Sequence, residues 1–305
     1  MEIKRFFRII LATFIAGFFL TSCEKFEGDQ TIPSYLSIDT IILVDNPGLL
    51  EGHSLTHNFT DVWVYVDEQV LGAFELPAMI PVLQNGTHNL TIYAGVKLNA
   101  LSGTRAGYSF TAPMIDDEFE FVMDSVIEIN PSVSYYDNTD FAWIEEFDFT
   151  NPESISLIPS SNSDTSLTEF TRNPTDPLYE RFGSRSGIGY VDSKNTVLEI
   201  TTKVEEDEGF YFPPGASPVM LEMEFNSDHL VGVGMFIRQS GIIQHPVLIL
   251  RPTNGEWKKV YVNFTPTISS YSNAVNFNVF FRADWDGVSE KGTVMLDNIK
   301  LVRKQ

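Results

Sequence analysis

Hydrophobic and polar residues alternate in short segments along most of the chain. After residue 23, no segment keeps the apolar period of about 3.6 residues that marks an amphipathic helix. Short alternating or continuous apolar runs are instead separated by turn residues, a pattern typical of β-strands. The segments predicted as strands are 35–44, 61–66, 70–74, 79–83, 89–94, 108–112, 119–129, 219–225, 231–237, 247–251, 258–264, 277–283 and 292–302. We therefore expect an all-β fold.

A polar segment divides these strands into two groups. Residues 132–140 contain few apolar side chains and are expected to be a linker between two domains. The short strands over 34–131 fit an immunoglobulin-like β-sandwich, with Asn85-Gly86 well placed for a tight turn. The strands over 141–305 are expected to form a second β-sandwich.

Strand alternation assigns an outward face to two strands of the second domain. The outward residues are Tyr261, Asn263, Asn278, Phe280 and Arg282, and they form one surface if the two strands share a sheet. An aromatic ring can pack on the C–H face of a sugar, while amides and a guanidinium bind vicinal hydroxyls. Trp285, in a loop between two expected strands, is a further candidate for ligand binding. The alternative is that Phe280 lies under a loop or against the first domain, and that Arg282 pairs with Glu222 or Glu224.

Two other pairs of side chains are expected to point outward. Trp63 and Tyr65 alternate with valines, and they are candidates for contact with the second domain or with a partner. Glu222 and Glu224 share one face of a strand and are the best carboxylate pair for glycosidase chemistry. Jelly-roll glycosidases that use one strand carry three acids spaced two apart, however, and the next outward residue is Asn226. We therefore expect no catalytic site.

The N-terminus has the pattern of an export signal. A basic start precedes the uncharged apolar run 9–20, which is shorter than a membrane-spanning helix and ends in Leu20-Thr21-Ser22-Cys23. This segment resembles a bacterial lipoprotein signal peptide. The resemblance implies removal of residues 1–22, acylation of Cys23 with chains such as palmitate, and a tether over 23–33. Several acyl chains would give stable membrane anchoring.

Composition excludes several classes of protein. The 305 residues include 41 acidic and 20 basic side chains, a net charge of −21, so no broad basic field attracts nucleic acid or an anionic membrane. One Cys cannot form an internal disulfide or a cysteine-cluster zinc site. The aromatic content of 13% is too high for a disordered chain.

Further short patterns extend the lipoprotein resemblance. The acidic stretch that follows Cys23 resembles the surface-export signal of Bacteroidetes lipoproteins. Asp39-Thr40-Ile41 and Asp124-Ser125-Val126 resemble their O-glycosylation pattern, with Thr40 and Ser125 as acceptors. Together these patterns imply a lipid-anchored protein of the outer membrane, and they favour the cell surface over the periplasmic face.

Each domain also resembles a known group. The hairpin around 85–92 is similar to small surface β-domains, PEGA-like domains among them. The opening Glu-Glu-Phe-Asp at 145–148, Gly255-Glu256-Trp257 before a strand, and the terminal strand at 296–301 resemble galactose-binding-like carbohydrate-binding jelly rolls. That group often holds a structural calcium ion, and the matching carboxylates here are Glu146, Asp148 and Asp297.

These observations lead to one prediction and two alternatives. We predict a non-catalytic, lipid-anchored surface protein whose jelly roll binds glycan, accessory to nutrient uptake, with no required cofactor. The first alternative is a structural or interaction subunit of an outer-membrane secretion, adhesion or motility complex. The second is a glycoside hydrolase. No nucleic-acid partner is expected.

Overall fold

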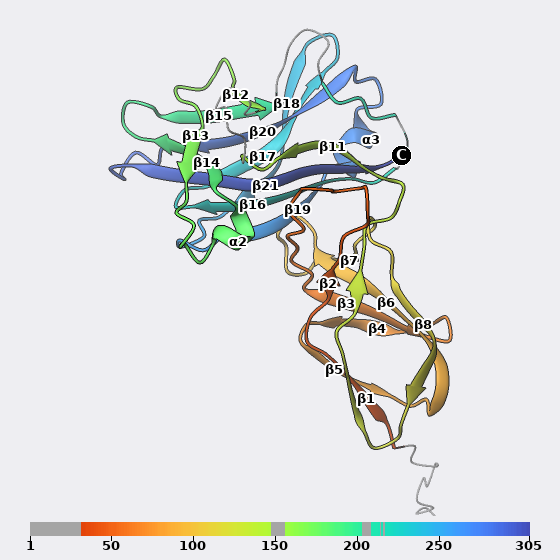
Figure 1. The fold of residues 1–305 in the computed structure, drawn as a ribbon. Helices are drawn as coiled ribbons and strands as arrows, with labels where there is room; N and C mark the ends of the chain where they lie inside the picture. Colours follow the sequence, from red (N-terminus) through yellow and green to blue (C-terminus); the bar gives the residue numbers. More distant parts are fainter. Residues whose placement is uncertain (1–31, 148–155, 203–208, 214, 216) are drawn as a thin grey trace, which may run out of the picture.

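The protein is built almost entirely of β-strands, arranged in two units (Figure 1). The computed structural model describes residues 32–147, 156–202, 209–213, 215 and 217–305. Several packed sheets of mainly antiparallel strands confirm the predicted all-β, β-sandwich class. No helix in the described part of the chain is long and apolar enough to cross a membrane.

The first unit consists of facing sheets that enclose one apolar core. Its strands are β1 (Ser34–Ile38), β2 (Ile42–Leu43), β3 (Asp61–Val66), β4 (Gln69–Glu75), β5 (Ala78–Val82), β6 (Gly86–Lys97), β7 (Arg105–Gly107), β8 (Met114–Phe121), β9 (Val126–Ile129) and β10 (Ser132–Val133). One sheet has the order β5-β1-β9, β10 pairs with β2, and the largest has the order β4-β3-β6-β7 with β8 also on β6. The pairing of β1 with β9 is parallel.

Side-chain alternation and turn chemistry explain this unit locally. Val62, Val64 and Val66 of β3 are buried in the core, as their spacing predicts. The hairpin between β3 and β4 turns through Asp67 and Glu68, which both have positive φ. Two residues with positive φ match the twist of the flanking strands, so this turn makes a close hairpin.

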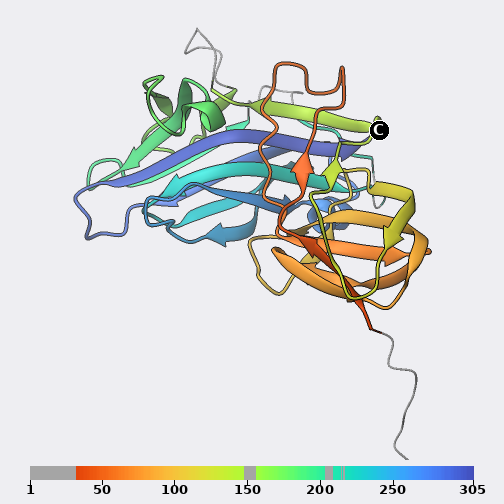
Figure 2. The same cartoon turned by 60° about the horizontal axis from the view of Figure 1, so that its bottom comes forward.

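The second unit is a sandwich of two larger sheets (Figure 2). Its strands are β11 (Thr139–Glu145), β12 (Leu157–Pro159), β13 (Thr168–Thr171), β14 (Arg185–Val191), β15 (Val197–Thr202), β16 (Val219–Ser227), β17 (Val231–Arg238), β18 (Ile242–Leu250), β19 (Lys258–Asn263), β20 (Asn276–Asp284) and β21 (Gly292–Lys304), with short helices α2 (Tyr179–Phe182) and α3 (Thr265–Ser270). One sheet has the order β13-β14-β21-β16-β19, with β11 on β21; the other has the order β12-β15-β20-β17-β18. The long β21 pairs with β11, β14 and β16, so the chain's last strand closes the unit against its first.

Several expected boundaries differ from the observed ones. The segment 35–44 contains two strands, and 119–129 is interrupted at residues 122–125, where the chain passes from one sheet to the other. The segment 108–112 is not a strand, although Thr111 forms an isolated bridge with Tyr135. The expected linker, 132–140, contains β10 and the start of β11. The chain between the units is therefore held by strand pairing.

The two units share an apolar core where they meet. Met220, Tyr261 and Val302 of the second unit pack into the core of the first. The backbone N–H of Asn99 donates to the carbonyl of Tyr261 at 2.8 Å, and Leu98 bridges to the same residue. We call this contact, between the outer face of β16, β19 and β21 and the first unit, the junction. Figures 1 and 2 both show the first unit beside the part of the larger sandwich that contains β16 and β19.

Candidate functional site

Glu222 lies in the junction rather than on an open surface. Its side chain is buried, and its Oε2 lies 3.0 Å from the Nζ of Lys259. The hydroxyls of Tyr108 and Tyr135, from the first unit, both donate to Oε1, the latter at 2.8 Å. The expected outward orientation is correct for the isolated second unit, but the first unit covers this face. The prediction that Glu222 is exposed is therefore wrong.

The charged side chains in the junction are paired with opposite charges or hydrogen-bonded to hydroxyl groups. Burial raises the pKa of Glu222, but Lys259, Lys300 and the two phenol hydroxyls outweigh burial, so its pKa lies below the ordinary value. Burial also lowers the pKa of Lys300, to about 8. The carboxylate of Glu224 is closed to solvent as well and pairs with Arg181 of α2 at 3.1 Å. Neither carboxylate faces a groove, so the pair is not positioned to flank a glycosidic bond.

Two of the predicted ligand-binding residues belong to the junction. Tyr261 is buried, and its hydroxyl accepts a hydrogen bond from the backbone N–H of Asn58 at 2.9 Å. The backbone N–H of Asn263 donates to the Oδ1 of Asn99 at 2.8 Å. Both lie on β19, whereas Asn278, Phe280 and Arg282 lie on β20 in the opposite sheet. The condition that the two strands share a sheet is not met, so the five residues do not form one face.

The outer face of the sheet β12-β15-β20-β17-β18 carries two adjoining hollows. One, of about 390 Å³, is lined by Leu230, Gly232, Gln244, Pro246, Ile249, Phe280, Arg282 and Asp284. The other, of about 540 Å³, is lined by Ile158, Pro159, Ser160, Ser161, Asn162, Glu199, Thr201, Phe236, Ile242 and Gln244. Because Gln244 lines both, we treat them as one feature and call it the groove. Phe280 and Arg282 were predicted for a ligand surface, and both lie here.

Glu199 organises the polar side of the groove. Its Oε2 accepts hydrogen bonds from Arg282 at 2.9 Å and from Gln244 at 2.7 Å. Its Oε1 accepts from Ser160 and, at 3.3 Å, from Asn162. Burial raises the pKa of Glu199, but the hydrogen bonds from Ser160, Arg282 and Gln244 outweigh it and lower the pKa below the ordinary value. One ionised carboxylate thus orients four hydrogen-bonding side chains.

An aromatic pair forms the apolar side of the groove. The ring centroids of Phe236 and Phe280 lie 4.9 Å apart. Gly234 permits this arrangement, because a Cβ there would lie 2.6 Å from the Phe280 ring and 2.3 Å from the carbonyl of His245. Gly232 differs, since its Cβ would meet nothing closer than 3.6 Å. Phe280 is only 2% exposed, so the half-buried Phe236 supplies most of the accessible aromatic surface beside the amide, hydroxyl and guanidinium groups.

The remaining two ligand candidates do not line the groove. Asn278 is buried on β20 and donates through Nδ2 to the carbonyl of Thr202 at 3.4 Å. Trp285 packs partly against the core of the second unit, and its Nε1 donates to the carbonyl of Ser289 at 2.8 Å. Of the six predicted ligand-binding residues, Phe280 and Arg282 therefore line the groove.

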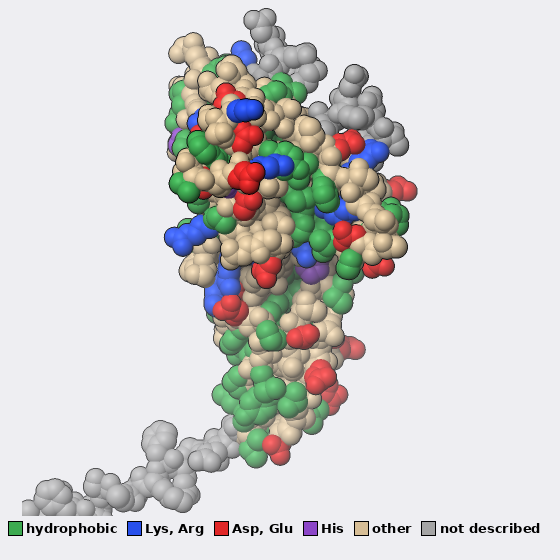
Figure 3. All heavy atoms as spheres, turned by 90° about the vertical axis from the view of Figure 1, so that its left-hand side faces the viewer, with side chains coloured by type: hydrophobic (Ala, Val, Ile, Leu, Met, Phe, Trp, Pro, Cys, Tyr) green, Lys and Arg blue, Asp and Glu red, His purple; other side chains and the backbone are tan. Residues whose placement is uncertain are grey.

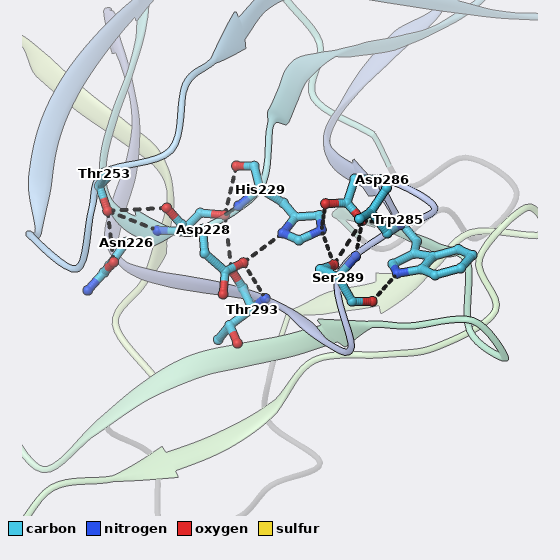
Figure 4. Close-up of polar contacts among 10 residues, drawn as sticks. Asn226, Asp228, His229, Thr253, Trp285, Asp286, Ser289 and Thr293 are labelled. Atoms are coloured by element: carbon cyan, nitrogen blue, oxygen red, sulfur yellow. Dashed lines mark hydrogen bonds and ion pairs between the residues drawn. The ribbon is translucent and has the colours of Figure 1, made fainter.

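A cluster at one end of the second unit has the composition of a hydrolytic triad. The Nδ1 of His229 lies 2.7 Å from Asp228, and its Nε2 lies 3.2 Å from the Oγ of Ser289 (Figure 4). The hydroxyl of Ser289, however, donates to Asp286 at 2.9 Å rather than to the imidazole. A carboxylate beside the hydroxyl also disfavours the oxyanion that acyl transfer requires. We interpret the cluster as structural: its hydrogen bonds hold the β16–β17 turn against the β20–β21 loop.

The two described carboxylates of the expected calcium site have other partners. Asp297 is buried against Arg172 and Ser186, and Glu146 interacts with His53, Ser54 and Lys300. Asp148 lies outside the described residues. Within the part of the chain that is described, no group of three or more His, Cys, Asp or Glu could hold a metal ion.

Other predicted sites keep the status of predictions. Trp63 and Tyr65 lie on the outer face of β3, half-buried, and Tyr65 packs edge-to-face on Tyr93 at 5.5 Å. Thr40 is exposed and Ser125 is half-buried, so both acceptor hydroxyls lie near the surface. Cys23 lies outside the described residues.

Sequence reasoning missed most of the groove. Glu199, Gln244 and Phe236 were not among the candidates. Alternation on β17 does contain a signal. The apolar residues at 231, 233, 235 and 237 face the core, which leaves Gly232, Gly234 and Phe236 on the outward side. No comparable signal marks Glu199, which only the pairing of β15 with β20 brings beside Arg282.

Comparisons with known proteins identify no family. No family model and no curated protein sequence match the chain. Among solved structures, one from a study of carbohydrate-binding modules of the β-sandwich superfamily covers 90% of this chain and 99% of its own, at 11% identity and a TM-score of 0.37. A module in complex with β-1,4-galactotriose covers 48% of this chain and 87% of its own, at 10% identity and a TM-score of 0.29. An exo-β-agarase covers 54% and 26%, at 10% identity and a TM-score of 0.34.

Proposed function

We propose that this chain is a non-catalytic, lipid-anchored protein of the outer membrane that binds neutral glycan in the groove and assists nutrient uptake. The observation that supports glycan binding is the arrangement around Glu199, where planar hydrogen-bonding groups lie beside the Phe236–Phe280 pair. Sugars present both hydroxyls and apolar C–H faces, so they suit a surface of this composition. The lipobox at Cys23 supports the anchor.

The charges of the groove favour a neutral ligand. Arg282 is the one basic residue that lines either hollow, and it is paired with Glu199 and with Asp284. An acidic sugar would meet two carboxylates and no free cation there. The hydrogen-bonding capacity of the groove therefore fits hydroxyl groups better than carboxylate or sulfate groups.

A steric variant tests the groove. Gly232→Val should fill the hollow without a backbone clash, because a Cβ at this position has room. Isothermal titration of the mature chain against a panel of neutral oligosaccharides should detect binding that Gly232→Val abolishes. Gly103→Val, at an open position of the first unit, is the matched control and should bind as the wild type does. Absence of binding at millimolar glycan, or normal binding by Gly232→Val, would contradict the proposal.

A further inference from the structure

One end of the first unit exposes a group of apolar side chains. Ile32 precedes β1, Leu83 follows β5, and Met123 and Val126 lie at the turn from β8 to β9. Their exposed fractions are 54%, 62%, 47% and 52%. With Tyr35, Met79 and Val122, which are also exposed, they form what we call the apolar tip. Figure 3 shows a concentration of hydrophobic side chains at this end of the molecule.

Strand pairing confirms that these residues are neighbours. Tyr35 of β1 is paired with Val126 of β9 on one side and with Pro81 of β5 on the other. The turn closes on the same end, because the backbone N–H of Asp124 donates to the carbonyl of Pro33 at 3.1 Å. Residues from three separate segments thus form one continuous apolar surface. Surfaces of this kind on soluble domains mark sites of interaction with proteins or membranes.

The position of the tip in the chain indicates what it contacts. The described chain begins at Ile32, which belongs to the tip, and Cys23 lies nine residues earlier. Nine extended residues span at most about 30 Å, so an acylated Cys23 would keep the tip close to the bilayer. The groove lies on the other unit, far along the chain from this end.

The charges around the tip define the kind of surface that it fits. Between Ile32 and Pro131 the only Lys and Arg residues are Lys97 and Arg105, and both pair with Glu75. Asp124 and Glu128, by contrast, lie within or next to the tip. Contact with lipid would therefore depend on apolar insertion and would be opposed by anionic headgroups.

We propose that the apolar tip inserts into the interfacial region of the bilayer and orients the second unit, with its groove, away from the membrane. This inference rests on the proposed lipid anchor, since the anchor brings the tip to the surface. Acyl chains alone would attach the protein through a tether and leave its orientation free. Contact through the tip restricts that freedom.

The single Cys makes a site-specific test possible. An acylated Cys23 has no free thiol, so Met123→Cys or Val288→Cys introduces a unique site for an environment-sensitive fluorophore. Val288 is the matched control, since it is apolar, 88% exposed and located in the second unit. The acylated full chain would be reconstituted in phosphatidylcholine vesicles with and without brominated acyl chains. We expect several-fold stronger quenching of the label at Met123 than at Val288, and weaker quenching when phosphatidylglycerol is added.

Other occupants of the tip give different results. Equal quenching at the two positions would overturn the proposal. So would a disulfide between two Met123→Cys chains, which would indicate a second copy of the protein, or a glycan mass at Ser125, which would cover the tip. If the lipid anchor itself were wrong, the protein would not float with the vesicles and Cys23 would react with the fluorophore. That outcome is distinct from flotation without quenching.

Discussion

The carboxylate of Glu222 and the ammonium group of Lys259 lie 3.0 Å apart in the junction, and both side chains are closed to solvent. Tyr108 and Tyr135 reach this pair from the first unit. A buried charge is tolerated only when it is paired and hydrogen-bonded, so the pair depends on the correct docking of both units. The relationship explains why β16 is buried on both faces.

Removal of the cation of this pair should destabilise the whole protein. Lys259→Met leaves the Glu222 carboxylate buried with one fewer cation, which should cost about 3–5 kcal/mol of unfolding free energy. Urea denaturation at neutral pH would measure the loss. Lys258→Met, at the exposed neighbouring position, is the control and should change the free energy by less than about 0.5 kcal/mol. The double variant Glu222→Gln, Lys259→Met should recover part of the loss, and a failure to recover would contradict the pairing.

Lys300 should make stability depend on pH in the alkaline range. Its pKa is lowered to about 8 in the folded protein from an ordinary 10.5, mainly by burial. Between these values the unfolded chain binds more protons, so the free energy of unfolding should rise with pH, by on the order of 3 kcal/mol. Burial raises the pKa of Tyr108, Tyr135 and Tyr261 in the folded protein. Their neutral hydroxyls therefore stabilise the fold below about pH 10, and this contribution to the free energy of unfolding is lost as the pH rises further.

Denaturation at closely spaced pH values from 7 to 10 would test this dependence. The rise above pH 8 should disappear in Lys300→Met, which has no titrating group at that position. A stability that falls steadily from pH 8, or a rise that persists in the variant, would show that Lys300 is not its source.

Glu199 should control glycan affinity without touching the apolar side of the groove. Glu199→Gln keeps the shape but removes the charge that orients Arg282 and Gln244. Loss of charge-assisted hydrogen bonds should weaken binding by about tenfold or more. Titration calorimetry would measure this, with Glu256→Gln, an exposed acid outside the groove, as the control. Unchanged affinity in Glu199→Gln would show that the polar row does not contact the ligand.

The two glycines of β17 should respond differently to the same substitution. In Gly234→Ala the new Cβ would clash with the carbonyl of His245 and with the Phe280 ring, which should cost about 1–3 kcal/mol. Gly232→Ala has room for its Cβ and should change stability by less than about 0.5 kcal/mol. Thermal unfolding of the pair provides the comparison. Equal effects would contradict the close packing of Phe280 on Gly234.

Local pattern was sufficient for much of the architecture. Apolar alternation predicted the strand class and the outward side of β16, β19 and β20, because side-chain direction in a strand depends only on position. It was insufficient where sheets are assembled. The interruption of 119–129 at the turn that carries Met123, and the separation of β19 from β20 into opposite sheets, depend on contacts between distant segments.

The sequence by itself determined the all-β class, the candidate anchor at Cys23 and the outward direction of Phe280, Arg282 and Glu222. Only the tertiary structure decided which outward faces remain open. The first unit covers Glu222 and Tyr261, while the opposite sheet keeps the groove, where Glu199 and Gln244 gather around Arg282. The physical reason is that alternation describes one strand at a time. Burial depends on which sheets and units pack against that strand, and this is decided by the whole chain.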